Sequence, residues 1–412
     1  MARYVALCSA GRLDRKEFNY RIGVVPIMSL EKRKKVVVLI DWYLPGYKAG
    51  GPIQSVANMV VRMKKVFDFA IITSDTDANE TSPYPGIKSD EWNTLPDGTR
   101  VYYFSKKELQ FSTLKKIMLK EQADVIYLNS LFSVFFTIYP LLIRKRFMPS
   151  RKTVLAPRGM LGKGALHIKP LKKRLFLLAS RVAGIYKNIT WHASTDLEKQ
   201  EVIKIFGKNQ RVRIATNLTA PKPIPEFKRV KEKGKARFFF LSRISTKKNL
   251  LATIQVFQQI PAGTNASLDI YGPIDDPVYW EACKEAMKKT PAHLQILYKG
   301  AIANEASNRM MADYHFSLLQ TQHENFGHSI VESLAAGCPV IISDQTPWRK
   351  LESSKAGWDI PLTDESALIN TLIACCAMDQ QTFDLWSRSA FEYASSIIND
   401  PALIDANSAL FD

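Results

Sequence analysis

Apolar residues come in short continuous runs that alternate with amphipathic stretches along most of the chain. The first clear run, KKVVVLIDWYLPG at residues 34–46, is rich in β-branched residues, as is typical of a parallel strand buried on both faces. A glycine turn and a stretch with helical spacing, YKAGGPIQSVANMVVRM, follow it. The same alternation predicts further strands at FDFAIITSD, RVYYFS, ADVIYLNS, RKTVLAPRG and NITWHAST, and helices at STLKKIMLKEQ and residues 170–183.

A second alternation begins at RFFFLSR, residues 237–243, and continues to CPVIISD, residues 338–344. The segment between the two, TAPKPIPEFKRVKEKGKA, is rich in proline and then in lysine, which indicates a linker. Alternating strands and helices at this spacing predict the α/β class, with two Rossmann-like doubly wound parallel-sheet domains facing across a cleft. The predicted parts are an N-terminal extension at 1–31, an acceptor-side domain at 32–218, a linker at 219–236, a donor-binding domain at 237–385 and a C-terminal helical segment at 386–412.

Charge divides the chain into two halves. Residues 1–218 hold 38 Lys and Arg against 17 Asp and Glu, whereas residues 219–412 hold 19 against 22. The excess is densest in residues 125–195, which contain 13 Lys or Arg and no acid. Such a field attracts the phosphates of nucleic acid, anionic lipid or a phosphorylated substrate, although a solvated basic face is the plainer reading. Nucleic acid is the weakest candidate, because the sequence has no zinc-finger spacing, RNP-like motif or recognition helix.

The sequence also bears on the compartment. Charges near the start of the chain interrupt any apolar core of a signal peptide, and a start at Met28 is expected to leave the fold intact. Residues 125–143 are uncharged and long enough to span a membrane, but their polar positions favour a strand, a turn and a buried helix. Five cysteines without ligand spacing indicate reduced thiols in the cytoplasm.

The stretch HENFGHSIVESLAAGCPVIISD, residues 323–344, carries two glutamates eight positions apart. Eight residues of α-helix turn by about 800°, so two helical glutamates would lie roughly 80° apart rather than in line. The glycine at 327 indicates instead that Glu324 lies in a loop and that Glu332 lies in a helix beginning near Gly327 or His328. Exposed N–H groups at that helix start suit an anion or sugar hydroxyls, and Glu332 suits a ribose diol. Taken alone the pair is weak, since glutamates at this spacing are common on helix surfaces.

Other strand ends carry further candidate groups. In SRISTKKN, Arg243 and Lys248 precede a helix, where charge, donors and helix dipole would align on a phosphate. In DIYGP, Gly272 allows a close backbone turn. Asp75 and Asp77 could hold Mn²⁺ or Mg²⁺ across a diphosphate, but no donor motif surrounds them.

The whole stretch at residues 323–344 resembles the E-x7-E signature of the family-4 retaining glycosyltransferases, which have the GT-B fold. The segment TPWRKLESSKAGWDIP is similar to the one that follows the signature in bacterial surface-polysaccharide enzymes, and the resemblance covers about residues 35–400. It implies transfer of a sugar from a nucleotide-diphosphate sugar with retention, without a metal or other cofactor. The leaving diphosphate would be stabilised mainly by electrostatics. The resemblance assigns catalysis to Glu324, Arg243 and Lys248, the ribose to Glu332, and the donor contacts to Gly50, Gly51, Asn325, Phe326, Gly327, His328 and Ser329. Gly272 is added to the donor site because of its turn at a strand end.

One position departs from the family pattern. Many relatives carry a histidine and a glycine after a late strand of the first domain, where this chain has LAPRGML. Arg158 is therefore predicted to occupy the position of that histidine in the donor site. His167 or His192 could substitute, but each is expected to be a structural histidine.

Three alternatives stay open. One is a metal-dependent GT-A-like transferase that uses Asp75 and Asp77. Another is a phosphorylase or epimerase with the same fold, although no lysine motif for pyridoxal phosphate is present. The third is a non-enzymatic module that binds anionic membranes, against which the intact donor motifs argue.

The stretch KPLKKRLFLLASRVAG, residues 169–184, predicts a helix with leucines on one side and cations near its edges. Such a helix can lie on an anionic leaflet. A core helix whose basic face is solvated would have the same sequence pattern. We predict peripheral binding at the cytoplasmic face of the cell membrane and a lipid-linked saccharide acceptor, as in polysaccharide biosynthesis, with no nucleic-acid partner. The cations assigned to this role are Lys172, Lys173, Arg174 and Arg181.

Overall fold

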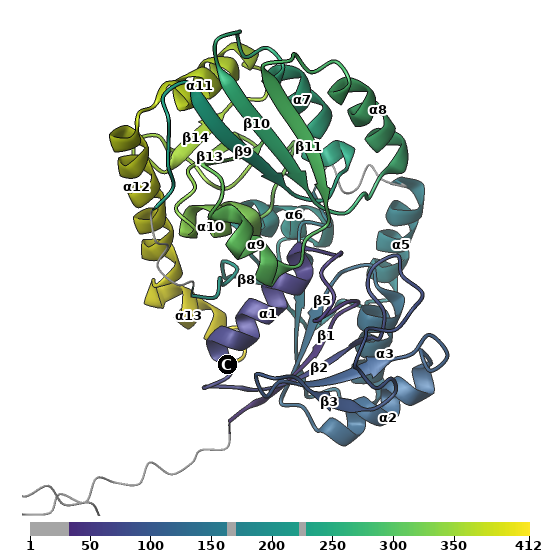
Figure 1. Cartoon of the computed structure of the whole chain (residues 1–412). Coiled ribbons are helices and arrows are strands. Elements are labelled where there is room, and N and C mark those ends of the chain that lie inside the picture. Colours follow the sequence, from purple (N-terminus) through teal and green to yellow (C-terminus); the bar gives the residue numbers. More distant parts are fainter. Residues whose placement is uncertain (1–32, 163–169, 222–227) are drawn as a thin grey trace, which may run out of the picture. The chain divides into compact units, whose positions relative to one another are not determined.

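Two separate β-sheets are built from the apolar runs, and their order along the chain is that of the two predicted domains. The structure, a computed structural model, describes residues 33–162, 170–221 and 228–412 (Figure 1). The predicted extension at residues 1–31, the start at Met28 and His167 lie outside the described residues. Lys34–Asp412 form one unit that contains both sheets.

The first sheet has eight strands in the order β3-β4-β2-β1-β5-β6-β7-β8. All neighbouring strands are parallel except β3 and β4, which pair antiparallel at one edge. The chain order reverses direction between β1 and β5, which is where ligands bind in open α/β sheets. Its strands are β1 (Lys35–Leu39), β2 (Asp68–Ser74), β3 (Trp92–Thr94), β4 (Arg100–Phe104), β5 (Val125–Asn129), β6 (Lys152–Ala156), β7 (Thr190–Ala193) and β8 (Arg211–Ile214), and its helices are α1 (Gly51–Met63), α2 (Phe111–Glu121), η1 (Val134–Ile138), α3 (Tyr139–Phe147), α5 (Pro170–Val182) and α6 (Asp196–Phe206).

The second sheet has six parallel strands in the order β11-β10-β9-β12-β13-β14. Here the chain order reverses between β9 and β12, so the loops after these two strands meet at the switch point. Its strands are β9 (Lys235–Leu241), β10 (Asn265–Tyr271), β11 (Leu294–Gly300), β12 (Phe316–Leu319), β13 (Val340–Ser343) and β14 (Gly357–Ile360), and its helices are η2 (Thr246–Lys248), α7 (Leu250–Phe257), α8 (Pro277–Met287), α9 (Asn304–Met311), α10 (His328–Ala335), α11 (Glu365–Ala377), α12 (Gln380–Ile398) and α13 (Pro401–Ser408). The predicted fold class of two doubly wound parallel sheets is confirmed.

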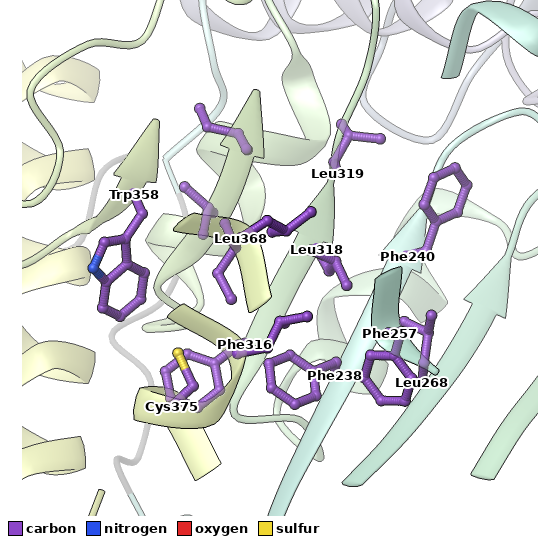
Figure 2. Close-up of a cluster of buried hydrophobic side chains, with 14 of the residues drawn as sticks. Phe238, Phe240, Phe257, Leu268, Phe316, Leu318, Leu319, Trp358, Leu368 and Cys375 are labelled. Atoms are coloured by element: carbon purple, nitrogen blue, oxygen red, sulfur yellow. The ribbon is translucent and has the colours of Figure 1, made fainter. Parts of the chain in front are cut away.

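The phenylalanines of β9 show why this strand reads as an uninterrupted apolar run. Phe238 and Phe240 pack into the main core on one face of the sheet, and Phe239 packs into a smaller cluster on the other face. Figure 2 shows the main core, in which the rings of Phe238 and Phe316 stack with their centroids 5.5 Å apart. From Phe238 to Phe240 the strand is covered on both faces and carries no polar residue, whereas Lys235 and Arg237 at its start are exposed.

The second half of the predicted linker packs against the second sheet. Arg229 donates hydrogen bonds to the carbonyls of Ala336 and Gly337, the latter at 2.7 Å, at the end of α10. Lys231 donates to the carbonyls of Cys376 and Met378 at the end of α11, both at 2.9 Å. Each cation satisfies carbonyls that a helix leaves unpaired at its C-terminus. Arg229 and Lys231 are therefore held against the second-sheet half. The strand β9 begins at Lys235, inside the segment predicted as linker.

The end of the chain returns to the first sheet. Helices α12 and α13 follow the second sheet, and Leu410 and Phe411 then pack into the core of the first. The ring of Phe411 lies edge-on to those of Phe67 and Tyr127, with centroids 5.1 and 5.8 Å away. The predicted C-terminal helical segment thus belongs structurally to both halves.

The uncharged stretch at residues 125–143 divides into β5, η1 and the start of α3, as predicted. Among the described residues, none of the helices combines the length and the apolar character that a membrane span requires.

Candidate functional site

The loops after β9 and β12 bring Lys248 and Glu324 together. The Lys248 ammonium forms an ion pair with the Glu324 carboxylate, and both side chains are largely buried. Burial opposes ionisation of Glu324, but the charge and hydrogen bond of Lys248, with Lys247 beside it, outweigh that effect and lower the pKa of Glu324. The backbone holds the two loops in register, because Gln322 N donates to the Lys247 carbonyl at 2.9 Å. Glu324 is therefore charged at neutral pH.

Arg243 lies at the exposed rim of the same loop. Its guanidinium pairs with Asp275 at 3.0 Å, in the loop after β10. Gly272 shapes this rim, because a methyl group there would lie 1.8 Å from the carbonyl oxygen of Ser242. Only glycine allows the two loops to approach so closely. Arg243 and Lys248 thus flank one loop, each with a carboxylate as its partner.

The helix α10 begins as the spacing of the signature predicts. It starts at His328 after Gly327, whose φ of 81° is the left-handed conformation that glycine tolerates. A side chain at this glycine would also lie 3.0 Å from Cγ of Glu324. Glu324 accordingly stands in the loop, whereas Glu332 stands inside α10 with 5% exposure. The two carboxylates reach the region from different elements.

Aromatic packing fixes the start of α10. The buried ring of Phe326 lies between those of Trp348 and His328, with centroid distances of 5.5 and 4.8 Å. Phe326 therefore anchors the loop through its side chain, and its carbonyl accepts from Trp348 Nε1, which leaves its backbone N–H for a ligand. Ser329 presents its carbonyl to the Ser333 hydroxyl at 2.6 Å, within the helix.

The glycine loop after β1 contacts the same helix start. Gly50 has a φ of 69° and precedes α1, and Gly51 lies 4.0 Å from the His328 ring when measured from its ideal Cβ position. The Ser55 hydroxyl and His328 Nε2 are hydrogen-bonded at 2.9 Å, in a buried position. The predicted glycine loop and the signature are thus adjacent in space.

Arg158 is engaged within the first-sheet half. Its guanidinium donates to the Asn129 side chain at 2.6 Å, to the Tyr127 hydroxyl at 2.8 Å and to Asn217. Tyr127 in turn is hydrogen-bonded to His192 Nδ1 at 2.7 Å. These bonds occupy three of the five N–H groups of the guanidinium. The placement of Arg158 in the donor site stays a prediction, and its observed partners indicate a supporting role.

His192 has the properties of a structural histidine. It is buried, and its Nε2 donates to the Ala215 carbonyl at 2.7 Å. Burial, with the nearby charge of Arg158, lowers the pKa of His192 to about 3. The imidazole is therefore neutral at physiological pH, and both of its nitrogens have partners within the first sheet.

A buried carboxylate that the sequence did not reveal joins the two halves. Glu198 on α6 has 1% exposure and accepts hydrogen bonds from the backbone of Gly159 at 2.6 Å and of Ser194 at 2.8 Å. It also accepts from the Asn325 amide at 3.4 Å, which donates to the Ser194 hydroxyl at 2.8 Å as well. Asn325 is therefore held by the first-sheet half, next to Glu324.

Asp75 and Asp77 are buried and have partners from the chain itself. Asp75 accepts from the Ser89 hydroxyl at 2.7 Å, and Asp77 accepts from the backbone of Tyr47 at 2.9 Å and of Lys48 at 3.2 Å. Asp77 thus supports the loop that leads to Gly50. The described part of the chain contains no cluster of three or more His, Cys, Asp or Glu side chains that could hold a metal ion.

The helix α5 presents its apolar side to solvent. The exposed positions recur at helical spacing, at Leu171 (76%), Leu175 (63%), Leu178 (61%) and Val182 (82%). These four side chains therefore lie outside the core, whereas Phe176 and Leu177 of the same helix pack against the core of the first sheet. Of the four cations, Lys172, Arg174 and Arg181 are exposed beside this stripe. Lys173 differs, because its ammonium lies 5.4 Å over the ring of Phe132 on the opposite side of the helix.

Known proteins resemble this chain in sequence and in fold. Residues 222–376 match the family described as glycosyl transferases group 1. The chain is 27% identical over 203 residues to a poly(glycerol-phosphate) alpha-glucosyltransferase of Bacillus subtilis (strain 168). That match covers 48% of this chain and only 29% of the relative.

Solved structures cover nearly the whole chain. The sucrose-phosphate synthase of Thermosynechococcus elongatus aligns with a TM-score of 0.67 and 15% identity, over 92% of this chain and 98% of the other. Alr3699/HepE of Anabaena, solved with UDP and glucose, aligns with a TM-score of 0.64 and 14% identity, over the same shares of the two chains. At this identity the likeness establishes the fold, which is GT-B.

Proposed function

We propose that the chain transfers a sugar from a nucleotide-diphosphate sugar to an acceptor, with retention at the anomeric carbon; the match of residues 222–376 to the glycosyl transferases group 1 family supports this. The observation that carries the proposal is the convergence of Lys248, Glu324 and the start of α10 at the switch point of the second sheet. Both a phosphate and a sugar find their natural partners there, namely a cation, helix N–H groups and carboxylates.

The roles follow from the chemistry of each group. The nucleoside diphosphate leaves with the electron pair of the anomeric bond, and Arg243, Lys248 and the N–H groups of α10 stabilise its negative charge. Glu332 accepts the hydroxyl hydrogens of the ribose, and Glu324 accepts those of the donor sugar. No metal is needed in this scheme, because cations of the chain supply the positive charge.

A donor panel tests this function. We expect one or more of the UDP-, GDP- and dTDP-sugars to be turned over, as detected by mass spectrometry of the released nucleotide and the product. Arg243→Ala should lower kcat/KM by roughly 10²–10³, the effect of losing about 3–4 kcal/mol of charge stabilisation. Glu332→Ala should mainly raise the KM for the donor. Full activity of both variants would refute this donor site.

We place the acceptor at the cytoplasmic face of the membrane, as a saccharide linked to lipid through a diphosphate. Support comes from the exposed leucine stripe of α5, flanked by Lys172 on one side and by Arg174 and Arg181 on the other. Each cation near an anionic surface contributes about 1 kcal/mol to binding. The similarity to a poly(glycerol-phosphate) glucosyltransferase makes a polymeric phosphate the alternative acceptor.

Flotation with liposomes and an acceptor panel separates these cases. Binding should require anionic lipid, weaken with salt, and fall at least fivefold when Lys172, Arg174 and Arg181 become glutamine. Lys173→Gln serves as the matched control, because this lysine faces Phe132. Equal flotation with neutral lipid, or transfer to soluble oligo(glycerol phosphate) but not to a short-chain prenyl-diphosphate sugar, would contradict the membrane acceptor.

A further inference from the structure

Two polar side chains from different halves of the chain meet at Gly162. A methyl group at this buried glycine would lie 3.1 Å from Oε1 of Glu201 and 3.5 Å from Nε2 of His323. Glu201 belongs to α6, and His323 directly precedes Glu324. The missing side chain of this glycine therefore leaves a gap of about one methyl group between a carboxylate, an imidazole and the Gly159 carbonyl oxygen, one residue away from the candidate sugar-binding glutamate.

One of these groups lacks a protein partner. His323 Nε2 is buried and makes no hydrogen bond with any residue that the structure describes. Buried polar atoms are satisfied in the great majority of cases, so an exception calls for an explanation. A ligand that completes the hydrogen bond is one such explanation, and the position beside Glu324 favours it.

The surrounding charges set the protonation of the pair. Burial raises the pKa of Glu201 to about 7, Glu198 on the same helix adds to this, and Lys247 of η2 opposes it. Burial lowers the pKa of His323, reinforced by Lys247 and Lys248 and opposed by Glu324 and Glu198. A neutral imidazole and a carboxyl group that changes charge near pH 7 thus face the gap.

We propose, on the basis of the transferase function proposed above, that Glu201 and His323 bind a hydroxyl group of the acceptor in the gap at Gly162. The Glu201 carboxylate accepts the hydroxyl hydrogen, and His323 Nε2–H donates to the hydroxyl oxygen. A hydroxyl matches this pair because it is a donor and an acceptor at once. The pair thereby places the acceptor next to the sugar held by Glu324, and determines which acceptors are used.

The first test is Glu201→Gln, assayed with the short-chain prenyl-diphosphate sugar and with oligo(glycerol phosphate). We expect kcat/KM for whichever of these acceptors is used to fall by 10-fold or more, while donor hydrolysis without acceptor stays within twofold of the wild type. Asp196→Asn is the control, because this carboxylate is exposed on the same helix. Unchanged acceptor kinetics in Glu201→Gln would overturn the proposal.

The pH profile separates binding from a purely structural role. Because the carboxylate form of Glu201 is required, kcat/KM for the acceptor should fall about tenfold per pH unit below 7 in the wild type. Glu201→Gln should abolish this dependence and leave that of donor hydrolysis as it is. A profile that persists in the variant would contradict the proposed role.

Gly162→Ala provides a test that leaves both side chains in place. The glycine has no left-handed backbone, so a methyl group acts by filling the space beside Glu201 and His323, where it also comes within 3.4 Å of the Gly159 carbonyl oxygen. We expect weaker acceptor use with normal donor hydrolysis, whereas normal acceptor use would overturn the proposal. A wild-type protein without any donor turnover would instead refute the underlying transferase function.

Discussion

At the scale of single residues, the ion pair with Lys248 keeps the Glu324 carboxylate charged. The lowered pKa of Glu324 means that its carboxylate contributes stability above its ordinary pKa of about 4.5, and that this contribution is lost as the pH falls through the lower folded value. Glu324 is therefore insensitive to pH in the neutral range, in contrast to Glu201.

Lys248→Met should make this insensitivity disappear. Without the ammonium, burial is the dominant influence on Glu324, and its pKa rises. We expect donor affinity to fall at least tenfold, and to fall further as the pH drops from 8 to 5, as measured by calorimetric titration. Lys248→Arg should retain most of the affinity at constant pH. A flat pH profile in Lys248→Met would show that Glu324 keeps its charge without the lysine.

The hydrogen bonds of Asp75 and Asp77 lead us to expect that metal removal has little effect on turnover. Both carboxylates already accept hydrogen bonds from the chain, so donor turnover should survive excess EDTA within twofold. Asp77→Ala should lower the melting temperature, because it leaves the partly buried backbone N–H groups of Tyr47 and Lys48 without their acceptor. Loss of turnover in EDTA that Mn²⁺ restores would revive a metal-dependent mechanism.

At the scale of elements, the strands that the sequence predicts best are those with long apolar runs, such as β1 and β9. The short edge strands β3, β8 and β14 were not predicted, because three or four residues carry too little pattern to be distinguished from loops. The start of α10 followed from Gly327, a local signal. The role of Glu198 could not be predicted from the sequence, because its partners Gly159 and Asn325 are 39 and 127 residues away in the chain.

The contact of Arg229 with the end of α10 can be tested by mutation. Arg229→Met should destabilise the protein by roughly 2–4 kcal/mol, since the carbonyls at the end of α10 lose a buried, charged donor. Lys233→Met, an exposed change in the same segment, should leave stability within about 0.5 kcal/mol. Differential scanning calorimetry measures both. Equal melting temperatures for the two variants would show that Arg229 is dispensable to α10.

At the scale of the whole molecule, stability depends on the return of the chain to the first sheet. Phe411→Ala removes a fully buried ring from among Phe67, Phe69 and Tyr127, and should cost about 3–5 kcal/mol. Phe147→Ala, a ring with 45% exposure, is the control and should cost much less. Chemical denaturation followed by tryptophan fluorescence compares them. A similar loss in both variants would mean that the C-terminal contact is incidental.

The same return has a mechanical consequence. The chain crosses from the first sheet to the second before β9, and it crosses back after α12, so the two halves are joined by two covalent straps. Two domains joined by a single connection can rotate relative to each other about any axis. A second connection restricts the rotation to the axis through both connections and opposes twisting of one domain against the other. Opening and closing around a donor would then follow one direction, and each closure would bring Asn325 back to the same partner, Glu198.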